Sequence, residues 1–412
     1  MARHFRVWAD IDLGALSSNF LAIRRRVGPR RKVIVVVKAD AYGHGAIPVA
    51  RQLVEDGAYA LGVGDSGEAI TLRESGIGAP ILILGAIVEG EIEQVVAYDI
   101  TTCLHSTERA QRLDREARRQ GRQASVHVMV DTGMARLGVR PHRIADLLAR
   151  IAKCPNLRLT GLCTHFSSAY SIADEFTPVQ QRRFDAVIES ALAALAPARP
   201  LVHAANSAAI FRSETDDSLL YDGVRPGAAI YGINPGGYFD GKAELKPVMS
   251  LKTQVIYLKE VPAGTPIGYN RSYVAPRKTR IATLPVGYND GYPYRLGNSS
   301  EVLVRGRRAP VVGMISMDYV TVDVGHVPGV VVGDEVTLIG RDGDDAVRVE
   351  ELARIVGSIP YEITCHVGRR VTKLYRSLWA ASASRGTAGA RPALETAAEI
   401  SPPLEAPPLV TA

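Results

Sequence analysis

The stretch Lys32-Val-Ile-Val-Val-Val-Lys-Ala-Asp-Ala-Tyr-Gly-His-Gly45 joins a run of apolar residues to a polar turn. Residues 33–37 are all β-branched and do not alternate with polar ones, which is typical of a parallel strand covered on both faces. The run ends at Lys38, where α/β folds place their ligands. Desolvation there would lower the pKa of the lysine amine and make it a nucleophile toward a carbonyl group. On these residues alone, a solvated lysine at a strand end is an equally good interpretation.

Strand and helix signals alternate on both sides of this stretch. The apolar spacing of 16–25 fits a helix, and helical stretches such as 45–56 and 66–75 separate the expected strands. About eight β-α repeats within roughly 230 residues favour a closed parallel β/α barrel over an open sheet. The expected strands are 33–37, 59–63, 80–84, 99–104, 124–130, 158–164, 200–204 and 222–224.

The pattern of apolar and polar residues changes after Gly236. Short alternating strands such as 249–258 and 319–324 are separated by turn signals, including Pro262-Ala-Gly264 and Gly333-Asp334, so this half is predicted to be mainly β. We expect a barrel domain at 9–240 and a β domain at 241–378. A short strand at 1–8 is expected to be part of the β domain. The Ala- and Pro-rich segment 381–412 is predicted to be a disordered tail.

Composition restricts the class of protein. Apolar residues make up 46% and charged residues 22%, as in soluble globular proteins. The net charge is +6, but the arginines are scattered through amphipathic segments such as 109–119, which favours solvated helix faces over nucleic-acid binding. The four cysteines lack metal-ligand spacing, so we expect no metal site and a reducing cytoplasm. No apolar run reaches ~20 residues and the first residues lack a signal-peptide core, so no membrane association is expected.

The segment Val37-Lys-Ala-Asp-Ala-Tyr-Gly-His-Gly45 resembles the pyridoxal-phosphate lysine segment of the alanine racemases. The resemblance extends over roughly residues 4–375. It implies that Lys38 carries the cofactor covalently and that Tyr42 helps to hold its phosphate. It also implies a fold-type III β/α barrel followed by a β domain, and a head-to-tail homodimer with shared active sites.

Further barrel segments carry the resemblance. The segment 130–138 implies that Arg136 approaches the cofactor's phenolic oxygen and the substrate, and 161–166 implies that His165 lies against the pyridine ring. The segments 203–207 and 223–232 imply cofactor contacts from Asn206, Ser207, Arg225, Gly227 and Ala228.

The residue expected at the ring nitrogen is Arg225. An arginine keeps its proton, so the ring nitrogen beside it stays unprotonated. A neutral ring is a weaker electron sink than a pyridinium held by an aspartate. It therefore discourages transamination and favours prompt return of the proton, which suits a racemase.

The β domain is expected to complete the site. Racemisation needs an acid or base on each face of the reacting carbon, and one lysine cannot serve both. The segment 267–273 implies that Tyr269 from the other subunit is the second base, so that Lys38 handles the D-alanine proton and Tyr269 the L-alanine proton. By the same resemblance Tyr288 and Met317 contact substrate, and Tyr361 binds phosphate and gates the site.

Four positions depart from the family pattern. Met129 stands where many members have a carbamylated lysine that pairs with the arginine, so Arg136 must be oriented by something else, such as a bound anion or a carboxylate. His127 lies on the same strand face but is a poor partner for a guanidinium. At the expected entrance, uncharged side chains replace charged ones at Met314, Tyr294 and Tyr170. A less polar entrance could admit another substrate.

The sequence thus predicts a pyridoxal-phosphate-dependent alanine racemase that supplies D-alanine for peptidoglycan. A broad-specificity racemase acting on serine or lysine is the main alternative, since it shares nearly all the motifs. A non-catalytic pyridoxal-phosphate barrel protein would lack residues 240–380, and a barrel decarboxylase would have an acidic partner in place of Arg225. The match of Gly62-Val-Gly-Asp-Ser-Gly67 to a dinucleotide fingerprint is better explained as a tight turn, because a dinucleotide site leaves Lys38 without a role.

Overall fold

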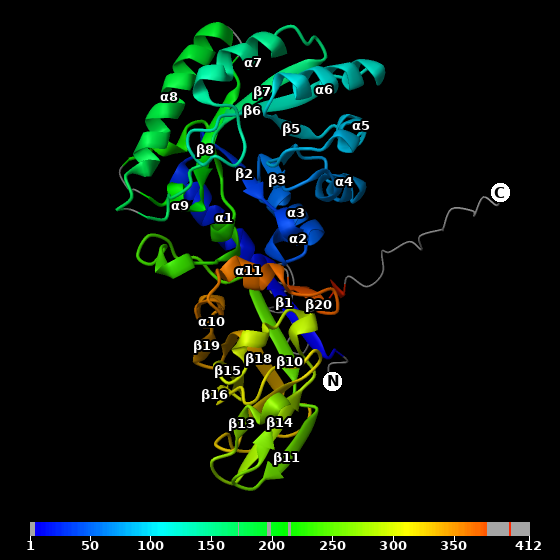
Figure 1. The fold of residues 1–412 in the computed structure, drawn as a ribbon, viewed down its shortest axis with the longest axis vertical. Coiled ribbons are helices and arrows are strands. Elements are labelled where there is room, and N and C mark those ends of the chain that lie inside the picture. Colours follow the sequence, from blue (N-terminus) through cyan, green and yellow to red (C-terminus); the bar gives the residue numbers. More distant parts are fainter. Residues whose placement is uncertain (1–4, 172, 196–198, 213–215, 377–394, 397–412) are drawn as a thin grey trace, which may run out of the picture.

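The computed structural model describes residues 5–171, 173–195, 199–212, 216–376 and 395–396. Eight parallel strands close into a barrel, as predicted, and a second, mainly β part lies below it in Figure 1. The barrel strands are β2 (Lys32–Val36), β3 (Ala60–Val63), β4 (Ile81–Ile83), β5 (Thr101–Leu104), β6 (Ala124–Met129), β7 (Leu157–Cys163), β8 (Leu201–Asn206) and β9 (Gly223–Arg225). Each lies within two residues of a strand expected from the sequence.

Helices surround the barrel. The predicted helix at 16–25 is longer, because the Asp12 carboxylate caps its start by accepting the Ala15 N–H. The elements are α1 (Leu13–Val27), α2 (Lys38–Tyr42), α3 (Ala46–Glu55), α4 (Ser66–Glu74), α5 (Ile92–Ala97), α6 (Thr107–Arg119), α7 (Ile144–Ile151), α8 (Phe176–Leu195) and α9 (Ser207–Ile210).

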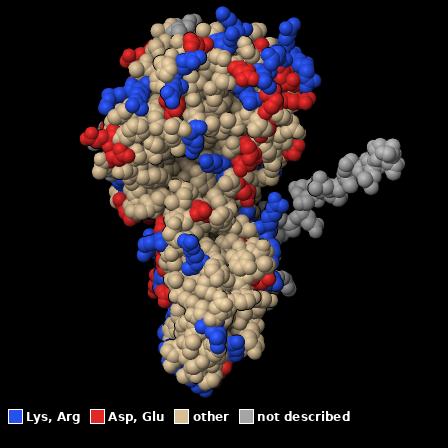
Figure 2. All heavy atoms as spheres, in the orientation of Figure 1, with Lys and Arg blue, Asp and Glu red and all other residues tan. Residues whose placement is uncertain are grey.

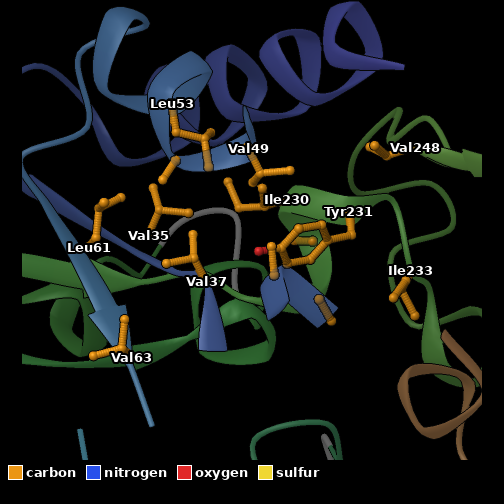
Figure 3. Packing of buried hydrophobic residues seen from close by; sticks show 14 of the residues in the cluster. Val35, Val37, Val49, Leu53, Leu61, Val63, Ile230, Tyr231, Ile233 and Val248 are labelled. Carbon is orange, nitrogen blue, oxygen red and sulfur yellow. The ribbon is translucent and has the colours of Figure 1, made fainter. Parts of the chain in front are cut away.

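The run 33–37 is apolar throughout because both faces of β2 are covered. Val35 and Val37 pack against Val49 and Leu53 of α3, as Figure 3 shows. Ile34 points the other way, into the barrel, where one residue from each of several strands forms a small apolar layer. The members of this layer are Ile34, Ala60, Leu82, Cys103, Met129 and Cys163. The end of β2, and with it Lys38, is therefore held from two sides.

The β domain is built on an eight-stranded sheet in the order β16-β15-β18-β10-β1-β20-β21, with β19 paired to β18. Its strands are β1 (Val7–Asp12), β10 (Met249–Gln254), β15 (Glu301–Val304), β16 (Arg307–Pro310), β18 (Glu335–Asp342), β19 (Asp345–Val347), β20 (Thr372–Arg376) and β21 (Glu395–Thr396). Strand β1 lies between β10 and β20 and continues to Asp12, four residues beyond the expected end. Apart from 395–396, the predicted tail lies outside the described residues.

Smaller elements complete the β domain. The strands β11 (Tyr257–Val261), β14 (Thr279–Leu284) and β17 (Val320–Asp323) form one sheet, and β12 (Pro266–Ile267) pairs with β13 (Tyr273–Val274). The helices α10 (Val349–Val356) and α11 (Pro360–Cys365) follow. Figure 1 shows α11 at the junction of the two parts, next to the barrel.

Acidic and basic side chains are interspersed on the face shown in Figure 2. The arginine-rich segment 109–119 forms most of α6, and Arg109, Arg112 and Arg119 pair with carboxylates. Arg112 lies 2.6 Å from both Glu89 and Glu108, and Arg119 lies 2.7 Å from both Glu93 and Glu116.

Candidate active site

A cavity of about 520 Å³ opens at the carboxyl ends of the barrel strands, where barrel enzymes bind their ligands. Ten of the residues proposed from the sequence line it, although they come from five barrel strand ends and from α11. They are Lys38, Tyr42, Arg136, His165, Asn206, Ser207, Arg225, Gly227, Ala228 and Tyr361. Met129 and Tyr170, two of the departures from the family pattern, line the same cavity.

The residues after Lys38 make up the rest of α2, and they form a turn of left-handed helix. Ala39, Asp40, Ala41 and Tyr42 have φ between 52° and 56°, a region that costs L-residues roughly 1–2 kcal/mol each. The Asp40 carboxylate stabilises the turn, since Oδ1 accepts the Ala46 N–H and Oδ2 pairs with Lys373 Nζ, both at 2.6 Å. The turn aims Lys38 and Tyr42 into the same cavity.

The end of this turn is packed against the β domain. Gly43 has φ +83°, and a Cβ on it would overlap the Thr364 carbonyl oxygen of α11. His44 is buried, and its Nδ1 lies 2.9 Å from the carbonyl oxygens of Ala41 and Tyr42, so Nδ1 carries the proton. Burial lowers the pKa of His44 to about 4 and keeps the ring neutral. Gly43 and His44 of the motif are thus explained by the turn.

Lys38 is accessible from the cavity, but its surroundings lower the pKa of its amine. Desolvation has the largest effect, and the positive charge of Arg136 adds to it. Glu68 and Cys365 act in the opposite direction. A lowered pKa leaves more of the amine unprotonated near neutral pH, so that it can attack a carbonyl or accept a proton, as expected.

Arg225 is almost fully buried, with 4% of its surface exposed. Its Nη2 donates to the carbonyl oxygens of Thr164 (2.6 Å) and Ala204 (3.0 Å), and its Nη1 donates to Nδ1 of His203 (2.5 Å). The charge is therefore compensated by carbonyls and a neutral imidazole, without an acidic partner in the described part of the chain. Burial lowers the pKa of Arg225, yet the group keeps its proton.

A histidine pair behind Arg225 was not expected from the sequence. His203 Nε2 lies 2.9 Å from His127 Nδ1. Because His203 Nδ1 accepts from the arginine, Nε2 must carry the proton and donate it to His127. From the sequence, His127 is only a poor partner for Arg136. In the structure it bonds to His203 and thereby supports Arg225. Only a side-chain contact across the barrel reveals this.

Hydroxyl groups gather around Gly227. Ser207 Oγ accepts the N–H groups of Gly227 (2.9 Å) and Ala229 (3.2 Å), so its own proton is free to donate elsewhere. A Cβ on Gly227 would lie 2.5 Å from Tyr42 Oη, so glycine keeps this end of the cavity open. The rings of Tyr42 and Tyr361 meet edge to face at 6.2 Å. Asn206 caps α9 by accepting the Ala209 N–H.

The sequence leaves open what orients Arg136. Within the described residues its side chain has no hydrogen bond or ion pair. Met129 is buried in the apolar layer inside the barrel, and the partly buried Leu137 packs against this layer. The Nδ1 atom of His165 lies 3.4 Å from Nη2 of Arg225. The cavity side of Arg136 is therefore open to an anionic ligand.

Three proposed site residues of the β domain are not brought to this cavity. Tyr269, Tyr288 and Met317 lie in connecting segments of the β domain. They are 67%, 46% and 52% exposed, respectively. Tyr269 lies between β12 and β13, and Figure 1 shows β13 far below the barrel. Tyr294 lies near Tyr288, with ring centroids 6.5 Å apart, and Met314 accepts a weak bond from Asn298. Tyr294 is exposed as well, whereas Met314 is half-buried.

The residues of the cavity fit pyridoxal phosphate. The hydroxyls around Gly227 suit a phosphate group, Arg225 suits a ring nitrogen, and Lys38 suits an aldehyde. The described residues contain no group of three His, Cys, Asp or Glu side chains that could hold a metal ion, and no helix among them is long and apolar enough to cross a bilayer. A closed barrel with this cavity and an appended β domain defines a two-domain barrel enzyme.

Comparisons with known proteins agree on one family. Residues 11–235 match the model of the alanine racemase N-terminal domain, and residues 248–375 match that of the C-terminal domain. The chain is 42% identical over 370 residues to the alanine racemase of Halothermothrix orenii, covering 90% of this chain and 97% of the relative. The chain therefore belongs to the alanine racemase family, and it is an isomerase.

Solved structures give the same result. The alanine racemase of Clostridium difficile 630 superposes with a TM-score of 0.86 at 34% identity, covering 91% of this chain and 96% of that one. The alanine racemase of Bartonella henselae, solved with covalently bound pyridoxal phosphate, superposes with a TM-score of 0.80 at 28% identity, covering 90% and 99%.

Proposed function

We propose that this chain interconverts L-alanine and D-alanine with pyridoxal phosphate, using Lys38 of one subunit and Tyr269 of the other as the two bases. The observation that carries the proposal is one cavity in which Lys38 lies with a buried Arg225 and a hydroxyl cluster. The product D-alanine would serve peptidoglycan synthesis in the cytoplasm. Family membership supports alanine as the substrate.

The cavity residues divide the work of binding. Tyr42, Ser207, Tyr361 and the N–H of Ala228 hold the phosphate, and Gly227 leaves it room. Asn206 fixes the start of α9 beneath the same group, and His165 packs against the ring. Pyridoxal phosphate, when bound, supplies the electron sink that weakens the Cα–H bond of the amino acid. Arg225 keeps the ring nitrogen unprotonated and thereby limits that sink.

Proton transfer needs one group on each face of the substrate carbon. Lys38, with its lowered pKa, takes or returns the proton of D-alanine. Tyr269 does not line the cavity of its own chain, which supports a second base that comes from another subunit. The exposure of Tyr269 supports a head-to-tail dimer in which its loop enters the partner's cavity. Arg136, Met317 and Tyr288 then surround the substrate carboxylate.

Purified mixed dimers test the shared site. A dimer of one Lys38→Ala chain and one Tyr269→Phe chain contains one intact site and one doubly altered site, so about half of wild-type activity is expected. The matched control pairs a wild-type chain with a chain that carries both substitutions. Its two sites each lack one base, and its activity should stay near background.

If each site took Lys38 and Tyr269 from the same chain, the order of activity in these two dimers would be reversed. That result would remove Tyr269 of the partner subunit from the mechanism. The measurement is racemisation of L-alanine followed by circular dichroism, with both dimers purified through two different affinity tags.

A broad-specificity racemase is the second candidate, favoured by one feature of the cavity. Tyr170 lines it and packs edge to face on Tyr238 at 5.1 Å, which places an aromatic wall where charge is common in the family. Racemisation of L-alanine, L-serine and L-lysine should be compared under identical conditions. A rate for serine or lysine equal to that for alanine would establish the second candidate.

A further inference from the structure

The carboxylate of Glu68 bridges two barrel strand ends. Its Oε1 accepts the N–H of Ala39 at 2.6 Å, and its Oε2 accepts the N–H of Gly64 at 2.8 Å. Glu68 stands in the first turn of α4, where Asp65 caps the helix by accepting the Glu68 N–H at 2.9 Å. The helix therefore presents this carboxylate in a fixed orientation.

Both bonded amides flank Lys38. Ala39 follows it directly in the chain, and a Cβ on Gly64 would lie 3.7 Å from the Lys38 Cβ. The same Cβ would lie 3.4 Å from Glu68 Oε2. Gly64 therefore lies between the Lys38 side chain and the Glu68 carboxylate, in contact with both. A carboxylate that binds both neighbours holds the base of the Lys38 side chain at a set distance from β3.

The bond to Ala39 also acts at the start of the left-handed turn. Ala39 is the first of the four residues with φ near +50°, a conformation that persists only when surrounding contacts impose it. Asp40 anchors the middle of the turn to Lys373, and Gly43 packs its end on α11. Glu68 supplies the anchor at the beginning, next to the lysine.

The charge of Glu68 has a second consequence. The groups that act on the Lys38 amine are Arg136, Glu68 and Cys365, and Lys38 in turn acts on His165. Burial and Arg136 lower the pKa of Lys38, whereas the Glu68 carboxylate raises it. Glu68 is thus the carboxylate that opposes the desolvation of this amine.

We propose that Glu68 is a positioning residue for Lys38, holding its backbone through Ala39 and Gly64 and placing a negative charge beside its amine. The proposal rests on the role of Lys38 as the base for D-alanine. No motif in the sequence points to Glu68, because its bonding partners lie on two different loops.

The test uses the isosteric variant Glu68→Gln in the full chain. A glutamine has one acceptor oxygen, so it cannot accept both N–H groups, and it carries no charge. We expect kcat to fall on the order of 10- to 100-fold through misplacement of the lysine. The rising limb of kcat against pH for D-alanine should move to lower pH, because loss of a nearby negative charge lowers the pKa of Lys38.

A second readout does not depend on catalysis. The cofactor is removed with hydroxylamine, Lys38 is labelled with trace acetic anhydride at a series of pH values, and the modified peptide is quantified by mass spectrometry. The midpoint of labelling should fall in Glu68→Gln. In Glu68→Asp, which keeps the charge but cannot span both amides, the midpoint should stay near that of wild type while kcat falls.

The matched control is Glu74→Gln on the same helix. Glu74 accepts a hydrogen bond from the Tyr98 hydroxyl on the surface, so its substitution should change neither readout. Unchanged kcat and an unchanged labelling midpoint in Glu68→Gln would overturn the proposal. If Lys38→Ala kept full activity, the proposed function would fail instead, and the labelling midpoint would still decide whether Glu68 acts on Lys38.

Discussion

Lys38 and Arg225 show how side chains of the same charge are adapted to different tasks. Lys38 reaches an open cavity beside the charge of Arg136, so its amine loses its proton more easily than a lysine in water. Arg225 is enclosed by carbonyl oxygens and His203 and remains charged. The positions of both residues could be predicted from motifs, whereas the partners of Arg225 could not, since they come from β7 and β8.

Substitution of Lys38 gives the first prediction at this scale. In Lys38→Ala the visible absorbance of protein-bound pyridoxal phosphate should disappear, and racemisation should fall at least ~100-fold, because covalent attachment and one base are lost together. The absorbance spectrum after gel filtration is the measurement. Lys32→Ala is the control, because Lys32 begins the same strand and lies over the Tyr59 ring, away from the cavity. Retained absorbance in Lys38→Ala would contradict the assignment.

At the scale of elements, the strands were predictable and the turn after β2 was not. An unbroken β-branched run indicates a strand covered on both faces, and the eight strands appear near their expected positions. A left-handed helical turn has no comparable signal, because Ala39, Asp40 and Ala41 are ordinary residues held there by contacts from Glu68, Lys373 and α11. The glycines of the motif mark only its end.

Comparing a substitution in this turn with one at Gly57, just after α3, separates backbone strain from packing. Gly43→Ala and Gly57→Ala both place a side chain at positive φ, which should destabilise the protein by about 1 kcal/mol each. Only Gly43→Ala also meets the Thr364 carbonyl of α11, whereas nothing lies within 4 Å of a Cβ at Gly57. We therefore expect a further loss of about 1–3 kcal/mol for Gly43→Ala. Urea unfolding monitored by far-ultraviolet circular dichroism measures both, and equal losses would contradict packing of the turn on α11.

At the scale of the whole molecule, the candidate site is divided between two regions. The barrel residues meet in one cavity, while Tyr269, Tyr288 and Met317 stay exposed on the β domain. Family resemblance could predict this division from sequence, since it assigns the tyrosine to another subunit. Physical patterns in the sequence could not, because short β-domain loops have no periodicity that links them to a barrel.

Buried neutral histidines predict how stability depends on pH. Burial lowers the pKa of His44 to about 4 and that of His127 to about 3, whereas both ionise near 6.5 in an unfolded chain. Between these values the unfolded state binds more protons, so the free energy of unfolding falls as pH drops below about 6.5. Each such histidine lowers the free energy of unfolding by about 1.4 kcal/mol per pH unit in this range. For His44 the range ends at its folded pKa.

Urea unfolding at a series of pH values, with saturating pyridoxal phosphate, checks this expectation. His44→Asn keeps a donor for the carbonyls of Ala41 and Tyr42 but cannot gain a proton, so its stability should depend less steeply on pH. The exposed His142→Asn serves as the control. An unchanged slope in His44→Asn would show that His44 does not carry this effect.

The central position of β1 has a consequence for synthesis. Strand β1 leaves the ribosome well before both of its partner strands, because its antiparallel neighbour β10 begins at Met249 and its parallel neighbour β20 at Thr372. At ribosomal speeds the barrel sequence takes on the order of ten seconds or more to appear, and β1 has no strand partner during that time. The barrel can close first, whereas the large sheet is completed only when the two ends of the described fold meet. Strand β1 thus holds the later strands β10 and β20 in one sheet.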